Sequence, residues 1–138
     1  MAARRALVVR SSGSLVMAVL IGLGGCSSSG GSPSQSVEAF YRALGRKDVA
    51  AACEVVSYGG KPLAGDDITL CRSGFQAIGE LATPADLSAL ASVSAPDIPT
   101  NGDHAGVLAD QLTGVPTAYR QDLTLVRIDG RWYIDSPM

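Results

Sequence analysis

Apolar residues repeat with helical spacing through the middle of this 138-residue chain and with strand-like alternation after it. Between residues 33 and 90, three groups recur three or four residues apart, which is the pattern of helices that bury one face. These groups are Val37, Phe40, Tyr41 and Leu44; Val49, Ala52, Cys53 and Val56; and Ile68, Cys71, Phe75 and Ile78. The pattern predicts three helices in this part of the chain.

Capping residues give the first helix its expected limits. Ser32 is placed as N-cap, Pro33 occupies the first helical position, and Gln35 completes a capping box. Gly45 follows the last apolar residue and is a candidate left-handed cap. We therefore expect a first helix over residues 33–45.

The other helices have weaker boundary signals. Asp48 is placed to cap the second helix, and the run of residues 58–62, Tyr-Gly-Gly-Lys-Pro, interrupts it. Asp66 or Asp67 can start the third helix. Thr83 precedes a further short helical turn that ends near Leu90, so three to four helices are expected.

Strand and turn signals dominate from residue 92 onward. Strands are predicted over residues 92–98, 105–112, 119–128 and 131–135, with Trp132 and Ile134 on one face of the last. Asn101-Gly102 and Asp129-Gly130 are hairpin turn signals. Helices followed by strands predict an α+β fold, with three to four N-terminal helices on a curved, mainly antiparallel sheet of about four strands.

The first 25 residues have the pattern of an export signal rather than of a domain. Arg4, Arg5 and Arg10 precede an apolar run at residues 15–23, and no acidic residue occurs there. Leu23-Gly24-Gly25-Cys26 then resembles the lipobox of bacterial lipoproteins. That resemblance implies cleavage before Cys26 and attachment of acyl chains, such as palmitate, to its thiol.

The segment after Cys26 and the charge of the remaining chain fit this interpretation. Residues 26–32 are rich in Ser and Gly, as in a flexible tether between a lipid anchor and a single domain over residues 33–138. Three of the 11 Lys and Arg lie before Cys26, whereas all 13 Asp and Glu follow it. This acidic balance argues against nucleic-acid binding. We expect a membrane-bound protein on the extracytoplasmic face.

Two segments resemble the nuclear-transport-factor-2-like superfamily, a cone-shaped fold that ketosteroid isomerase shares. The first segment comprises residues 37–44 and 48–53, and the second comprises residues 123–135. The resemblance implies a sheet that curls around the first helix and can leave a pocket at the wide end of the cone. Because the chain is short for this fold, that pocket is expected to be shallow or filled.

Cys53 and Cys71 are expected to form a disulfide. If Cys26 is acylated, these two remain as an even pair, and both fall on the apolar faces of neighbouring predicted helices. An extracytoplasmic location permits the bond. Two buried reduced thiols, or a redox or metal role, are the alternatives.

No constellation of residues predicts catalysis or a cofactor. His104 follows Asp103 at a turn, and no group of residues has metal-ligand spacing. The ketosteroid isomerase resemblance suggests a phenol and a carboxyl for proton transfer, for which the candidates are Tyr41, Tyr119, Asp110 and Asp122. Trp132 and Tyr133 either line a ligand pocket or anchor the core.

The sequence therefore favours a non-enzymatic binding or accessory domain of the cell envelope, anchored to the membrane by lipid. Its partner would be an envelope protein. A carrier or sensor of a small apolar ligand in the cone pocket is the first alternative, and an isomerase-like or lyase-like enzyme is the second. A dry core would favour the protein partner, and an open apolar cavity would favour the ligand.

Overall fold

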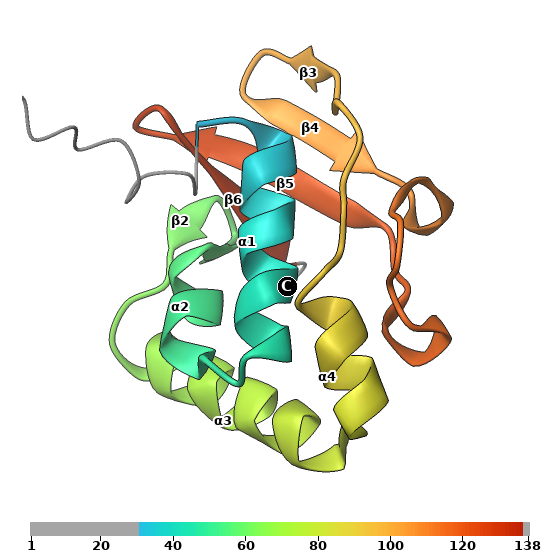
Figure 1. Ribbon diagram of the computed structural model, residues 1–138. Coiled ribbons are helices and arrows are strands. Elements are labelled where there is room, and N and C mark those ends of the chain that lie inside the picture. Colours follow the sequence, from blue (N-terminus) through green and yellow to red (C-terminus); the bar gives the residue numbers. More distant parts are fainter. Residues whose placement is uncertain (1–30, 137–138) are drawn as a thin grey trace, which may run out of the picture.

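The computed structural model describes residues 31–136, which form an α+β fold with α1 lying across a mixed sheet (Figure 1). The signal segment, Cys26 and most of the tether lie outside the described residues. The helices are α1 (Pro33–Gly45), α2 (Val49–Glu54), α3 (Asp66–Leu81) and α4 (Pro84–Leu90). The α+β class and the upper estimate of four helices are confirmed.

The sheet has six strands in the order β2-β1-β6-β5-β4-β3, rather than the four expected. The strands are β1 (Val56–Tyr58), β2 (Lys61–Pro62), β3 (Thr100–Asn101), β4 (His104–Val107), β5 (Leu123–Ile128) and β6 (Arg131–Ser136). All neighbouring pairs are antiparallel except β1 and β6, which are parallel. Because β1 and β2 precede α3, the helices do not all come before the sheet.

The β1–β2 hairpin replaces the predicted end of the second helix. Val56, which the helical pattern assigned to that helix, pairs instead with Ile134 of β6. Gly59 and Gly60 have positive φ angles of 59° and 74°, which let the chain reverse tightly. The residues that looked like a helix breaker therefore form a turn between two strands.

Three of the predicted strands are shorter in the structure or missing. Residues 92–98 form only one isolated bridge, between Ser94 and Thr113, in a segment where Pro96 lacks an N–H donor. The strand predicted over 105–112 ends at Val107, and a short 3₁₀ turn follows. The strand predicted over 119–128 begins only at Leu123.

Both predicted hairpins occur, with one change of register. Asp129 and Gly130, with φ angles of 50° and 77°, form the turn between β5 and β6. Asn101 pairs with His104, so the other loop consists of Gly102 and Asp103 rather than Asn101 and Gly102. Gly102 has a φ of 63°, and it occupies the first loop position, where a type II′ turn needs glycine.

The predicted N-caps of α1, α2 and α4 are confirmed, whereas α3 starts at Asp66 after Gly65 without a side-chain cap, and the role assigned to Gly45 is wrong. Ser32, Asp48 and Thr83 each accept a hydrogen bond from the backbone N–H three residues later. Lys47, not Gly45, has the positive φ after α1. A Cβ on Gly45 would lie within 3.0 Å of the backbone of Leu87 and Ala91, so this glycine permits the close approach of α4.

The core lies between α1 and the sheet. The predicted apolar stripe of α1 is buried there, as are Trp132 and Ile134. The hydroxyl of Ser36 on α1 donates to the carbonyl of Trp132 at 2.8 Å, which ties the helix to β6. This packing leaves α3 beyond the end of α1, where it covers little of the sheet (Figure 1).

Candidate functional site

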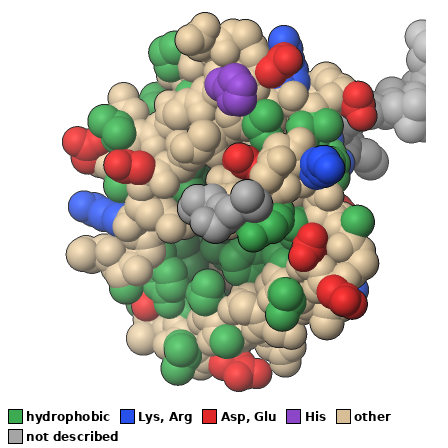
Figure 2. Space-filling view, turned by 180° about the vertical axis from the view of Figure 1, so that it is seen from behind, with side chains coloured by type: hydrophobic (Ala, Val, Ile, Leu, Met, Phe, Trp, Pro, Cys, Tyr) green, Lys and Arg blue, Asp and Glu red, His purple; other side chains and the backbone are tan. Residues whose placement is uncertain are grey.

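Among residues 31–136, an open apolar cleft lies between α3 and strands β1 and β6. One part of it has a volume of about 430 Å³. Figure 2 shows the hollow among hydrophobic side chains on the face turned away in Figure 1. Its apolar lining includes Val56, Tyr58, Leu63, Leu70, Cys71, Phe75 and Ile78.

A second hollow of about 480 Å³ continues the cleft over the sheet. It shares Val56, Phe75 and Ser136 with the first hollow, so the two form one continuous depression. Phe40 of α1, Leu123 of β5 and Ile134 of β6 supply its apolar floor. We call the two hollows together the α3 cleft.

The outer wall of the cleft, α3, is anchored at few points. Gly79 is its only buried residue, and Leu70 is 70% exposed at the rim. The Phe75 ring meets the Phe40 ring edge to face, with centroids 5.4 Å apart. A disulfide joins Cys71 of α3 to Cys53 of α2, with Cα atoms 6.0 Å apart. These contacts hold the helix against the body of the domain without filling the space beneath it.

The charged residues at the cleft are acidic. Asp67, Asp122 and Asp135 line it, and its described lining contains no Lys, Arg or His. One oxygen of Asp135 accepts hydrogen bonds from the Ser57 hydroxyl at 2.7 Å and the Gly60 N–H at 3.1 Å. Asp122 accepts from the Ala109 N–H at 2.8 Å. The cleft therefore offers apolar walls with a negative rim.

The predicted disulfide is present in the structure, whereas the predicted lipid site, Cys26, lies outside the described residues. The helical spacing correctly placed Cys53 and Cys71 on facing sides of α2 and α3. Cys71 also lines the α3 cleft. The disulfide therefore stands directly beside the candidate site.

Neither of the two phenols considered for proton transfer forms a hydrogen bond to a carboxyl in the described part of the chain. Tyr41 is buried in the core, where burial raises the pKa of its phenol, and its hydroxyl has no hydrogen-bond partner among the described residues. Tyr119 packs at the edge of the core, and Asp110 is exposed in a 3₁₀ turn. Only Asp122 reaches the cleft. The arrangement of a phenol beside a carboxyl, which isomerase chemistry needs, is not seen around Tyr41.

The Asp103-His104 pair does not form the start of a catalytic triad. Asp103 forms an ion pair with Arg127 at 2.9 Å, and His104 lies exposed on β4. Trp132 is buried beneath the Arg127 guanidinium, which lies 5.5 Å from its ring centre. Trp132 is thus a core anchor, whereas Tyr133 lines a smaller crevice on another side of the domain.

Sequence reasoning missed Leu63, Leu70 and Gly74 as cleft residues. Gly74 carried a usable signal, because glycine within a helix costs about 1 kcal/mol relative to alanine and needs a compensating reason. Here a Cβ would meet nothing within 4 Å, so the glycine widens the cleft. Leu63 lies in a loop, where no periodicity points to it.

Within residues 31–136 there is no group of three or more residues placed to hold a metal ion, and no helix long and apolar enough to cross a membrane. Comparison of the chain with protein-family models, with curated proteins and with solved structures finds no match. The candidate function accordingly depends on the geometry of the α3 cleft and on the export-signal pattern of residues 1–26.

Proposed function

We propose that this protein is a lipid-anchored extracytoplasmic domain that binds a small apolar ligand in the α3 cleft. The observation that carries the proposal is the open apolar hollow of about 430 Å³. Sites for small molecules are typically apolar clefts of about 300–1,000 Å³ with a few polar groups. Of the functions that the sequence left open, the carrier or sensor therefore has the strongest support.

The charge at the rim narrows the chemistry of the ligand. Asp67, Asp122 and Asp135 would repel a negatively charged group entering the cleft. A neutral or positively charged apolar molecule fits the rim better. A ligand without negative charge is therefore part of the proposal.

The lipid anchor is supported by the basic start, the apolar run and the lipobox-like residues 23–26. Two acyl chains on Cys26 would be sufficient for stable attachment to a membrane. The short tether would then keep the α3 cleft near the lipid surface, where apolar molecules concentrate.

A relationship to the nuclear-transport-factor-2-like superfamily remains part of the same proposal. It is supported by the way α1 lies across the sheet and by the presence of a hollow beside the strands. The ligand-binding proposal does not depend on this relationship, because the cleft is described by its own residues.

We expect Gly74→Leu to abolish ligand binding, because the new side chain would fill the space beneath α3 that Gly74 leaves open. The full chain, extracted gently from its own membrane, would be examined by native mass spectrometry. Wild-type protein should carry a co-purifying small molecule, and the variant should carry at least about tenfold less.

Ser73→Leu is the matched control for this experiment. It adds the same side chain one position earlier on α3, at an exposed residue outside the cleft. Its ligand content should equal that of the wild type. An equal amount of ligand on Gly74→Leu, or none on the wild type, would contradict the proposal.

We expect Cys26→Ala to abolish acyl labelling of the protein, because the thiol that would receive the lipid is removed. Cells fed a radioactive or alkyne-bearing fatty acid provide the measurement, with Cys53→Ala/Cys71→Ala, which leaves no free thiol in the domain, as the cysteine control. Unchanged labelling of Cys26→Ala would disprove the lipid anchor. Ligand binding in the α3 cleft would still be tested separately, by the Gly74→Leu experiment.

A protein partner is the second candidate, and it is favoured by the exposed apolar residues of α3. Leu70 and Leu81 are 70% and 84% exposed. A stoichiometric polypeptide in the same mass spectra, with no small molecule, would favour this candidate over a carrier.

A further inference from the structure

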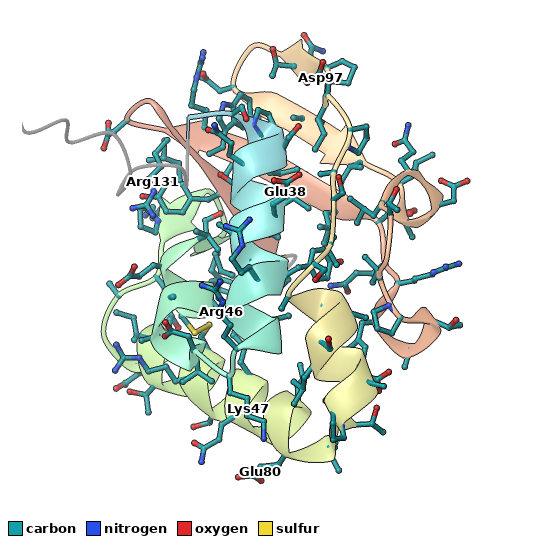
Figure 3. The ribbon with its side chains drawn as sticks, in the orientation of Figure 1. Glu38, Arg46, Lys47, Glu80, Asp97 and Arg131 are labelled. Carbon is teal, nitrogen blue, oxygen red and sulfur yellow. A yellow bond between two sulfur atoms is a disulfide. The ribbon has the colours of Figure 1, made fainter. Side chains whose placement is uncertain are left out.

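A second crevice of about 270 Å³ lies between α2, α3 and the β1–β2 hairpin; it adjoins the α3 cleft at Val56 and Leu63 but differs from it in charge. Two arginines line it, Arg72 of α3 and Arg131 at the start of β6. Figure 3 shows Arg131 at the side of the molecule where α2 and β2 lie. The disulfide lies between the two sites, since Cys71 lines the cleft and Cys53 lines the crevice, while Val56 and Leu63 line both.

Arg131 lines this crevice and has a donor that no described residue uses. Its Nε is buried and has no hydrogen-bond partner among the described residues. The guanidinium lies over the Tyr133 ring, 5.4 Å from the centroid, so cation–π attraction helps to hold it in place. A buried donor that belongs to a charged group is costly to leave unpaired, and an acceptor entering the crevice would remove that cost.

The second arginine adds to the positive charge. In the part of the chain that the structure describes, Arg127 and Asp103 form the only ion pair, so neither Arg72 nor Arg131 is neutralised by a carboxylate within 4.0 Å. Glu54 also lines the crevice without pairing to either. Two arginine side chains lining one hollow favour a carboxylate or phosphate group, which guanidinium binds with directed hydrogen bonds.

The other walls of the crevice are mostly apolar. Val56, Pro62, Leu63 and Ile68 contribute them, together with the Tyr133 ring. We propose that the crevice binds a small organic anion, with its oxyanion on Arg131 and Arg72 and its apolar body against these side chains. This site takes a different ligand from the α3 cleft, whose acidic rim would reject such an anion, although Val56 and Leu63 line both.

Isothermal titration calorimetry of the full chain in a nonionic detergent tests this site, with protein-free detergent as the blank. Phenyl phosphate, benzoate, inorganic phosphate and neutral phenol are the probes. Phenyl phosphate or benzoate should bind, and the stronger of the two identifies the preferred oxyanion. Inorganic phosphate should bind about tenfold more weakly, because it lacks an apolar body, and phenol should not bind.

Variants separate the crevice from the rest of the surface. Arg131→Gln and Arg72→Gln should each weaken binding of the preferred probe by about tenfold or more, whereas Glu54→Gln should strengthen it a few-fold by removing a negative charge. Arg46→Gln makes the same change of charge at an exposed residue outside the crevice and should have no effect. Arg72 is exposed, so its variant keeps the test valid if Arg131→Gln fails to fold.

Three results would overturn the proposal. They are no binding of either organic anion, equal binding of phenyl phosphate and inorganic phosphate, and equal losses in Arg72→Gln and Arg46→Gln. Ligand retention in the α3 cleft, measured on Arg72→Gln, should stay at the wild-type level, so failure at one site is distinguishable from failure at the other.

Discussion

Reduction of the disulfide between Cys53 and Cys71 is expected to lower the free energy of unfolding by about 3 kcal/mol. The bond closes a loop with a sequence separation of 18, and the chain-entropy model gives about 3 kcal/mol for loops of this size. For a domain of about 100 residues this corresponds to a fall in Tm of about 12–24 °C. Thermal denaturation with and without a reductant measures it.

The loss of stability on reduction should be largest in α3. This helix buries only Gly79 and otherwise depends on half-buried contacts such as Phe75 against Phe40. Amide hydrogen exchange after reduction should therefore accelerate more in α3 than in β5 and β6, because opening α3 exposes little apolar surface. Since α3 is a wall of the cleft, ligand retention should fall as well.

The double variant Cys53→Ala/Cys71→Ala serves as the control. Its Tm should match that of the reduced wild type and should not respond to the reductant. A wild-type Tm that is the same in both conditions would mean that the bond does not contribute to stability.

Substitution of Gly45 by Ala is expected to destabilise the protein by about 3 kcal/mol, even though alanine is normally the better helix residue. The added Cβ would lie within 3.0 Å of the Leu87 carbonyl oxygen and of the Ala91 nitrogen and Cα. These are backbone atoms, which cannot move without shifting α4. That shift would disturb Leu90, a fully buried residue of the same helix.

Gly74→Ala provides the opposite case with the same chemical change. It lies within α3, where a Cβ would meet nothing within 4 Å, so the substitution should stabilise the protein by about 0.5–1 kcal/mol. Chemical denaturation of both variants and the wild type measures the difference. A Gly45→Ala variant as stable as Gly74→Ala would show that α1 and α4 are not closely packed.

Local signals in the sequence predicted much of the helical half and the hairpins. Ser32, Asp48 and Thr83 cap helices through hydrogen bonds that span three residues, so the sequence pattern contains both partners. The β5–β6 turn is also local, because Asp129 and Gly130 are residue types that tolerate its positive φ angles. Predictions failed where a residue is held by a distant partner, as with Val56, which pairs with Ile134 instead of extending a helix.

The candidate sites were less predictable than the fold. Cys53 and Cys71 could be paired because helical periodicity placed both on apolar faces. The cleft could not be foreseen, because it results from where α3 lies relative to β1 and β6. The crevice brings together Arg72 and Arg131, which are far apart in the chain and carry no motif. Tyr41 and Asp110 were candidates for proton transfer by residue type alone. In the fold Tyr41 is buried in the core, whereas Asp110 is exposed.

The sequence by itself determined the starts of α1, α2 and α4, the β5–β6 turn and the apolar stripe of α1, and it favoured the pairing of the two cysteines. Each of these depends on residues within one or two helical turns or on a simple periodicity. Only the tertiary structure decided that β1 joins the sheet beside β6, where Ser57 donates to Asp135 across 78 residues of chain. It also decided that α3 stands off the sheet and leaves a cleft open, because that spacing arises from packing between distant elements.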